Sequence, residues 1–119
     1  MTVSPTITFR HLDPSPALEA KVREYAEKLD KYYDRIMSCR VIIEAQHRHH
    51  HKGNLYHVRF DVTVPDHEIV VNRAPAKHHE HEDVYVAIRE SFEAARRQLQ
   101  DYARRKRDHS GVAKQQPGI

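Results

Sequence analysis

Residues 55–71 read LYHVRFDVTVPDHEIVV, the clearest structural signal in the chain. Apolar and polar side chains alternate over residues 56–64, which is the period of a strand with one buried face. Residues 65–67, Pro-Asp-His, break the alternation and predict a short turn. The alternation resumes over residues 69–71 and ends before Pro75. The stretch therefore predicts two consecutive strands joined by a turn.

Two segments nearer the N-terminus also have the period of a strand. Ile7 and Phe9 alternate with polar neighbours, so residues 6–11 predict a first strand. Residues 39–46 alternate in the same way and predict a second one. The polar stretch 47–54, which ends in Gly-Asn, separates this strand from the next and is typical of a turn.

Two helices are predicted in addition to the strands. Ser15 is the expected N-cap of the first helix and Pro16 its first residue, and apolar side chains then recur at helical spacing to about residue 35. Asp83 is the expected cap of the second helix, which runs to about Arg107. The apolar stripe of the second helix consists of Val84, Tyr85, Ile88, Phe92, Ala95, Leu99, Tyr102 and Ala103.

The order β-α-β-β-β-α predicts the fold class α+β, with one four-stranded sheet and two helices packed on one face. A β-α-β start favours parallel first and second strands joined by a right-handed crossover. The domain is expected to cover residues 1–107. Residues 108–119 are expected to form a flexible C-terminal tail, because they contain Gly111, Pro117 and Gly118 and have little to bury.

The composition narrows the class of protein. With 119 residues, of which 39% are hydrophobic, the chain fits one compact domain and not two. No segment approaches the roughly 18 apolar residues of a membrane span, and no secretory signal is present. Cys39 is the only cysteine, which excludes an internal disulfide and a cysteine-based zinc site. We therefore expect a reducing, cytoplasmic location and no membrane partner.

Both predicted helices carry a strip of cations away from the core side. The first strip consists of Lys21, Lys28, Lys31 and Arg35, and the second of Arg89, Arg96, Arg97, Arg104 and Arg107. A basic surface on two neighbouring helices is typical of proteins that neutralise RNA phosphates. Ordinary solubility is the alternative, and Glu24 and Glu93 favour it. Tyrosine and phenylalanine fall at inward positions, so no aromatic platform for bases is predicted.

Histidine is unusually frequent, with 11 residues in the chain. Eight of them are predicted to meet at one end of the domain: His11, His47, His49, His50, His51, His78, His79 and His81. A metal-binding or metal-sensing module, with zinc or nickel held by these histidines and by Glu80, Glu82 or Asp83, is the alternative function. Phosphate contact, pH-tuned RNA binding and simple solvation remain open for the same residues. We predict no physiological metal site and no cofactor.

Catalysis has little support in the sequence. The nucleophile elbow, the phosphate-binding loop and the zinc-protease helix motif are all missing, and the chain has only three glycines. Cys39 falls at an inward strand position, where a buried thiol is expected and not a nucleophile. We therefore predict that the protein is not an enzyme and assign neither catalytic residues nor a small-molecule substrate.

Two segments resemble the hibernation-promoting factor and protein Y family of ribosome-associated proteins. Residues 28–36, KLDKYYDRI, are similar to that family's K-L-x-x-Y-F/Y-D-R-I helix end. Residues 83–88, DVYVAI, are similar to the start of its second helix, and residues 97–99, RQL, to the sequence that follows. The two segments occur in the same order and on the same element pattern over residues 6–107.

The resemblance implies a fold like that of double-stranded-RNA-binding domains. It also implies binding to the small ribosomal subunit, in the channel for messenger and transfer RNA, so that idle ribosomes are inhibited under stress. Longer relatives carry a further domain after this region. The chain resembles a short form and is not expected to join two ribosomes through such a domain.

The resemblance also assigns site residues. Lys28 and Arg35 match basic positions of the first motif, and Arg97 and Arg105 match basic positions of the second helix. Three positions that are often basic in the family differ here, namely Ala94, Asp101 and Ala103, and Arg96 and Arg104 stand in neighbouring turns. The RNA-binding set predicted overall is Lys21, Lys28, Lys31, Arg35, Arg89, Arg96, Arg97, Arg104 and Arg105.

Overall fold

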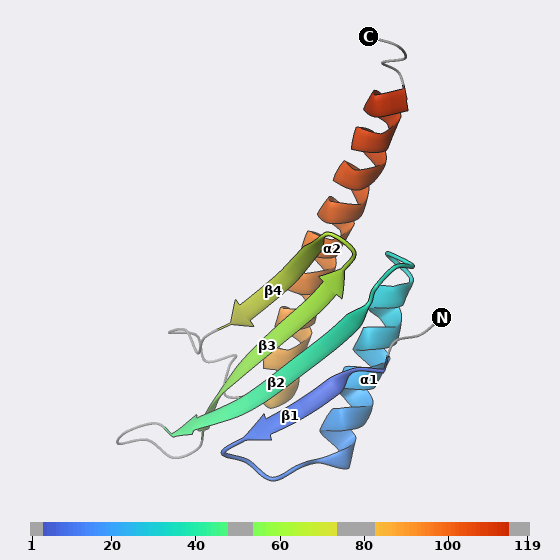
Figure 1. Ribbon diagram of the computed structural model, residues 1–119. Coiled ribbons are helices and arrows are strands. Elements are labelled where there is room, and N and C mark those ends of the chain that lie inside the picture. Colours follow the sequence, from blue (N-terminus) through green and yellow to red (C-terminus); the bar gives the residue numbers. More distant parts are fainter. Residues whose placement is uncertain (1–3, 48–53, 74–82, 115–119) are drawn as a thin grey trace.

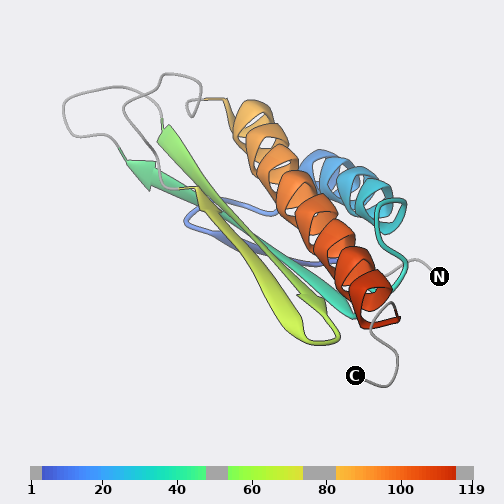
Figure 2. The same cartoon turned by 90° about the horizontal axis from the view of Figure 1, so that it is seen from above.

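The computed structural model describes residues 4–47, 54–73 and 83–114. The elements are β1 (Thr6–Arg10), α1 (Pro16–Asp30), β2 (Ser38–His47), β3 (Asn54–Val64), β4 (His67–Arg73) and α2 (Val84–Lys114). Both helices lie on one face of a single sheet, and the other face is open (Figures 1 and 2). The predicted α+β architecture is confirmed.

The sheet has the strand order β1-β2-β3-β4. β1 pairs with β2 in parallel, and the two following pairs are antiparallel. The register aligns inward side chains across the sheet, since Phe60 lies opposite Val41 on one side and Val71 on the other. This alignment creates one buried face and one open face, as the period of two predicts.

Helix α1 begins where the sequence predicts and ends earlier. The Ser15 hydroxyl accepts a hydrogen bond from the Leu18 amide at 3.3 Å, as an N-cap does. The helix stops at Asp30, five residues before the predicted end, and the Tyr32 amide donates to the Leu29 carbonyl in a tightened last turn. Ile36 is buried nonetheless, because the connection to β2 carries it back to the core.

Helix α2 is longer than predicted. Asp83 caps it through its carboxylate, which accepts from the Tyr85 amide at 2.9 Å, and the helix continues to Lys114, past the predicted end at Arg107. Half of the segment expected to be a tail is therefore helical, and residues 115–119 lie outside the described part of the chain. None of the described helices combines the length and the apolar character needed to cross a bilayer.

The core lies between the sheet and the two helices. Val22 and Leu29 of α1, Phe60 of β3, and Ile88 and Leu99 of α2 are all fully or almost fully buried and belong to one cluster. Tyr85, predicted to face the core, is 43% exposed. Ser91 lies about 60° around α2 from Ile88 and faces the sheet, where its hydroxyl donates to the Val58 carbonyl. Tyr85 lies about 60° from Ile88 on the other side, and it is therefore turned away from the sheet.

Cys39 occupies the predicted inward position on β2. Burial raises the pKa of its thiol to about 12, and the negative charges of Asp30 and Asp61 contribute to the shift. A thiol with such a pKa stays protonated at neutral pH and reacts poorly, because the thiolate is the nucleophile. The structure therefore supports the expectation of an inert buried thiol.

Candidate nucleic-acid interface

The two helices meet along a line that brings their cations together. Tyr25 of α1 stacks on Phe92 of α2, with ring centroids 4.5 Å apart and planes 23° from parallel. Arg89 and Arg96 lie three residues before and four residues after Phe92, and therefore on the same side of α2. We call this line the interhelical seam. Its cations are Lys21 and Lys28 of α1, Lys31 directly after α1, and Arg89, Arg96, Arg104 and Arg107 of α2.

Two lysines of the seam flank the Tyr25 ring. The Lys21 and Lys28 ammonium groups lie 5.6 Å and 5.5 Å from its centroid, within the range of a cation–π contact. The lysine stems are one α-helical turn on either side of Tyr25, so the ring anchors both of them. The core packing of Tyr25 thus holds two positive charges at the surface of the seam.

Tyr32 lies at the surface of the seam, although tyrosines were predicted at inward positions. Tyr32 is 39% exposed, because α1 ends at Asp30 and the side chain leaves the helical stripe. The Arg96 guanidinium carbon lies 5.9 Å from its ring centroid. The prediction that no aromatic ring accompanies the cations is therefore wrong, since Tyr32 offers a partly exposed ring beside Arg96.

Beyond Tyr32 the seam opens into a groove of about 430 Å³. Its lining includes Lys31 and Tyr32 from the end of α1, and Gln100, Arg104 and Arg107 from α2. Lys31, from the first predicted helix, and Arg104 and Arg107, from the second, therefore line the same groove.

A second groove, of about 290 Å³, adjoins the first and shares Ala103 and Arg107 with it. Tyr33, Asp34 and Arg35 line it from the connection after α1, and Lys106 lines it from α2. Arg35 therefore joins the same basic region, although it lies outside the helix in which it was predicted. Together the two grooves extend the seam toward the C-terminal half of α2.

Two of the predicted RNA-binding residues belong neither to the cations of the seam nor to the lining of these grooves. Arg97 is exposed and follows Arg96 by one residue, which turns it about 100° away from the α1 side. Arg105 is turned away from Arg104 by the same angle and donates to the Asp101 backbone carbonyl at 3.4 Å. The structure thus brings most of the predicted set together and leaves these two outside the grooves, although Arg97 lies only about 20° around α2 from Arg104, two turns further on.

Carboxylates neutralise part of the seam. Lys21 pairs with Glu24 at 3.4 Å, Arg96 with Glu93 at 2.8 Å, and Arg104 with Asp101 at 2.9 Å. Such exposed pairs are worth about 0.2–1 kcal/mol, so a phosphate can replace the carboxylate at little cost. Within the described part of the chain, the remaining predicted cations have no carboxylate at ion-pair distance: Lys28, Lys31, Arg35, Arg89, Arg97 and Arg105.

The turn between β3 and β4 fixes the C-terminal half of α2. The Asp66 carboxylate accepts hydrogen bonds from the Tyr102 hydroxyl and the Lys106 ammonium. His67 stacks on the Tyr102 ring at 5.6 Å, and Tyr33 meets that ring edge-on at 5.3 Å. Because Tyr102 and Lys106 lie on either side of Ala103 and Arg104, this contact sets the position of the groove residues.

The contact predicts a pH-dependent stability. The hydrogen bonds from Lys106 and Tyr102 lower the pKa of Asp66 below its ordinary value of 3.8. A carboxyl whose pKa is lowered by folding stabilises the protein above its unfolded pKa, and this contribution disappears as the pH falls through the folded pKa. Asp66→Asn is therefore expected to lower the thermal midpoint at neutral pH and to match the wild type in strong acid.

Thermal unfolding at both pH values measures this difference. Glu27→Gln, an exposed change on α1, serves as the control and should shift the midpoint at neither pH. Equal midpoints for Asp66→Asn and the wild type at neutral pH would show that the Asp66 contact does not hold α2.

The structure describes few of the clustered histidines. Residues 48–53 and 74–82, which carry most of them, lie outside the described residues, as does the predicted loop over 74–82. Of the eight, His11 has a described side chain, and one of its ring nitrogens lies 3.7 Å from a carboxylate oxygen of Glu44. His57, which is not one of the eight, has a ring nitrogen at the same distance from the other Glu44 oxygen. Within the described ranges, no three potential ligands come close enough to hold a metal ion. The metal-binding alternative stays a prediction about the two undescribed segments.

The fold and the seam together define an α+β domain with a basic helical face. The chain belongs to the sigma 54 modulation protein / S30EA ribosomal protein family, whose family model matches residues 6–107. The resemblance to hibernation-promoting factor and protein Y, stated above from two short motifs, is thereby confirmed. The family is one of ribosome-associated proteins. A comparison with curated proteins found no match.

Two solved structures show the same fold. The N-terminal domain of Thermus thermophilus Protein Y superposes with a TM-score of 0.64 at 20% identity, covering 86% of this chain and 99% of that one. A ribosomal subunit interface protein from Coxiella burnetii gives a TM-score of 0.62, also at 20% identity, with 83% of this chain and 96% of that one covered. The sheet order and the helical layer are therefore those of known members of this class.

Proposed function

We propose that the protein binds RNA of the small ribosomal subunit through the interhelical seam, in the channel for messenger and transfer RNA, and thereby inhibits translation by idle ribosomes in the cytoplasm. The observation that carries the proposal is the convergence of cations from α1 and α2 on one continuous surface. The ribosome is proposed as the partner because the chain belongs to a family of ribosome-associated proteins.

The seam suits a phosphate backbone in shape as well as charge. Lys31, Arg104 and Arg107 line a groove that is open to the surface and not a closed cavity, so phosphates of an RNA backbone have access to it. Arg35 continues the positive charge into the adjoining groove. Backbone contacts of this kind position a protein on folded RNA without reading its sequence.

The exposed ring of Tyr32 adds a contact that charge alone does not provide. A base or ribose stacked on this ring would lie beside the Arg96 guanidinium, which is the arrangement of a mixed stacking and cation–π site. The single ring favours one unpaired nucleotide at this point and backbone contacts elsewhere. We propose a non-enzymatic role on this basis, since binding of this kind requires only contacts with the RNA.

Salt dependence of binding tests the proposal. If six to eight phosphates are contacted, the log–log slope of affinity against salt is expected to be roughly −4 to −7. Co-sedimentation with purified small subunits over a potassium chloride series measures the slope. Large subunits pelleted under the same conditions are the control.

Two results would contradict the proposal. One is an absence of co-sedimentation with small subunits at low salt. The other is equal affinity for both subunits, which would indicate non-specific attraction of a basic protein to any RNA.

A further inference from the structure

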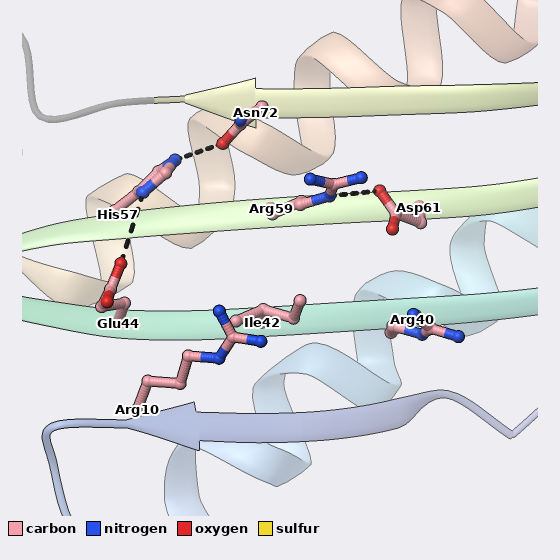
Figure 3. A pocket seen from close by; sticks show the side chains of 8 residues that line it. All are labelled: Arg10, Arg40, Ile42, Glu44, His57, Arg59, Asp61 and Asn72. Carbon is pink, nitrogen blue, oxygen red and sulfur yellow. Dashed lines mark hydrogen bonds and ion pairs between the residues drawn. The ribbon is translucent and has the colours of Figure 1, made fainter.

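The open face of the sheet carries a hollow of about 290 Å³, on the opposite side of the sheet from the seam. All four strands contribute to it, and Figure 3 shows the side chains that line it. Three of them are arginines, one from each of the first three strands: Arg10, Arg40 and Arg59. Ile42 is the apolar residue among the lining side chains. None of these four residues belongs to the predicted RNA-binding set.

Strand register explains why the three arginines surround Ile42. Arg59 lies directly across from Ile42 on β3, and Arg40 precedes Ile42 by two residues on β2. Thr8 of β1 lies across from Ile42 on the other side, so Arg10 is displaced by two residues along β1. Neighbouring strands are about 5 Å apart and alternate residues roughly 7 Å apart, within reach of long side chains.

Figure 3 shows how the side chains lie around Ile42. The Arg10 side chain extends from β1 toward Ile42, and Arg40 lies further along β2, across from Asp61 (Figure 3). Arg59 lies along β3 with its guanidinium held by Asp61 at 2.8 Å, and this carboxylate raises the pKa of Arg59. A guanidinium that is fixed by a neighbour loses less side-chain freedom when it binds a further anion.

The acidic groups of the hollow are largely occupied by other partners. Glu44 lies opposite Arg10 in the register, but its carboxylate turns toward the ring nitrogens of His57 and His11, each 3.7 Å away. Asp61 is engaged by Arg59. Within the described part of the chain, Arg10 and Arg40 have no carboxylate at ion-pair distance. Two guanidinium groups without a carboxylate partner among the described residues therefore line the hollow together with one apolar side chain.

We propose that this hollow is a second phosphate-binding site, in which Arg10, Arg40 and Arg59 hold a backbone phosphate of RNA above Ile42. The inference rests on the proposed function, because a domain that enters a channel in RNA meets RNA on both of its faces. Guanidinium groups suit this ligand because their planar forks bind phosphate oxygens in pairs.

The lining also indicates which part of the RNA is recognised. The hollow is polar, and its only large apolar residue is Ile42. The His57 imidazole is the one aromatic ring in its lining, and its two nitrogens lie beside oxygens of Asn72 and Glu44, so this ring is already held by the sheet. Asp61 and Asn72 provide oxygen acceptors beside the arginines, and a ribose 2′-hydroxyl can donate to such groups. Phosphate and sugar, and not the base, are therefore the ligand.

Arg10→Gln and Arg40→Gln, singly and together, test the site. Binding to purified small subunits is measured by filter titration over a potassium chloride series. Each substitution is expected to weaken binding about tenfold at moderate salt and to reduce the salt slope by about 1, because one phosphate contact is lost. Arg23→Gln, which removes an exposed charge on α1 outside both surfaces, is the matched control and should change neither value.

A substitution that is expected to strengthen binding provides a second test of the site. Asp61→Asn removes a negative charge from the hollow and keeps an amide oxygen that can accept from Arg59, so it is expected to strengthen binding several-fold. Glu19, the ion-pair partner of Arg23, lies on α1 and outside the hollow. Glu19→Gln removes one negative charge there and is the control for an effect of net charge alone. An equal gain in both variants would overturn the site, because it would reflect net charge only.

The outcomes separate this inference from the proposed function. Seam variants that lose small-subunit binding while the double variant Arg10→Gln/Arg40→Gln binds normally would overturn the second site and leave the proposed function intact. Loss of binding to adenosine monophosphate in the double variant, with unchanged binding to subunits, would assign the hollow to a free nucleotide. A dimer that the double variant dissociates, seen by sedimentation velocity, would assign the open face to a second copy of the chain. Either of these results overturns the proposal.

Discussion

Replacing Lys31 and Arg104 together by glutamate is expected to abolish binding to the small ribosomal subunit. Both side chains line the groove at the end of α1 and both are exposed, so the change reverses charge without disturbing the core. A negative group placed where a phosphate binds loses the contact and adds repulsion, which we expect to weaken binding about a hundredfold for each reversal. Filter titration with purified small subunits measures the effect.

The controls distinguish a local effect from a loss of fold or of net charge. The circular dichroism spectrum and the thermal midpoint of the double variant should equal those of the wild type. Arg23→Glu makes the same change of charge as either single reversal, on the side of α1 away from α2, and it should bind within about threefold of the wild type. If Arg23→Glu weakens binding as much as Lys31→Glu does, the seam is not the interface.

Phe60→Ala is expected to cause the largest loss of stability. Phe60 is fully buried in the interior strand β3, between Val41 and Val71 of its neighbours. Truncating a buried phenylalanine costs about 3–5 kcal/mol, since it removes apolar contacts and leaves a cavity. This is a large part of the 5–15 kcal/mol that typically separates the folded from the unfolded state. Urea unfolding followed by circular dichroism measures the free energy of unfolding.

Thr63→Ala on the same strand is the matched control, because Thr63 lies on the open face of the sheet. It is expected to change the free energy of unfolding by less than about 1 kcal/mol. Similar losses in the two variants would show that the buried and open faces of the sheet are assigned incorrectly.

The sheet could be predicted from the sequence because its signal is local. The period of two over residues 39–46 and 56–64 places every second side chain on the buried face, and the observed register agrees. The ends of the helices could not be predicted in the same way. Ile36 follows Leu29 by seven residues, so it fits a further two turns of helix as well as it fits the extended connection that carries it to the core.

The site was predictable in part for a related reason. A strip of cations can be read along one helix, but the line where two helices meet depends on which side chains pack between them. The stacking of Tyr25 on Phe92 sets that line, and the early end of α1 exposes Tyr32 beside Arg96. The hollow on the open face depends on the register of several strands at once, which no single segment of sequence contains.

Directed hydroxyl-radical probing from the seam is the most direct test of the central claim. An iron chelate is attached to Ala103→Cys, a position shared by the two grooves, and Cys39 should not be labelled because its buried thiol stays protonated. The account predicts cleavage of small-subunit ribosomal RNA along the channel for messenger and transfer RNA, and little cleavage from Arg23→Cys. Cleavage confined to large-subunit RNA, or equal patterns from the two positions, would contradict it.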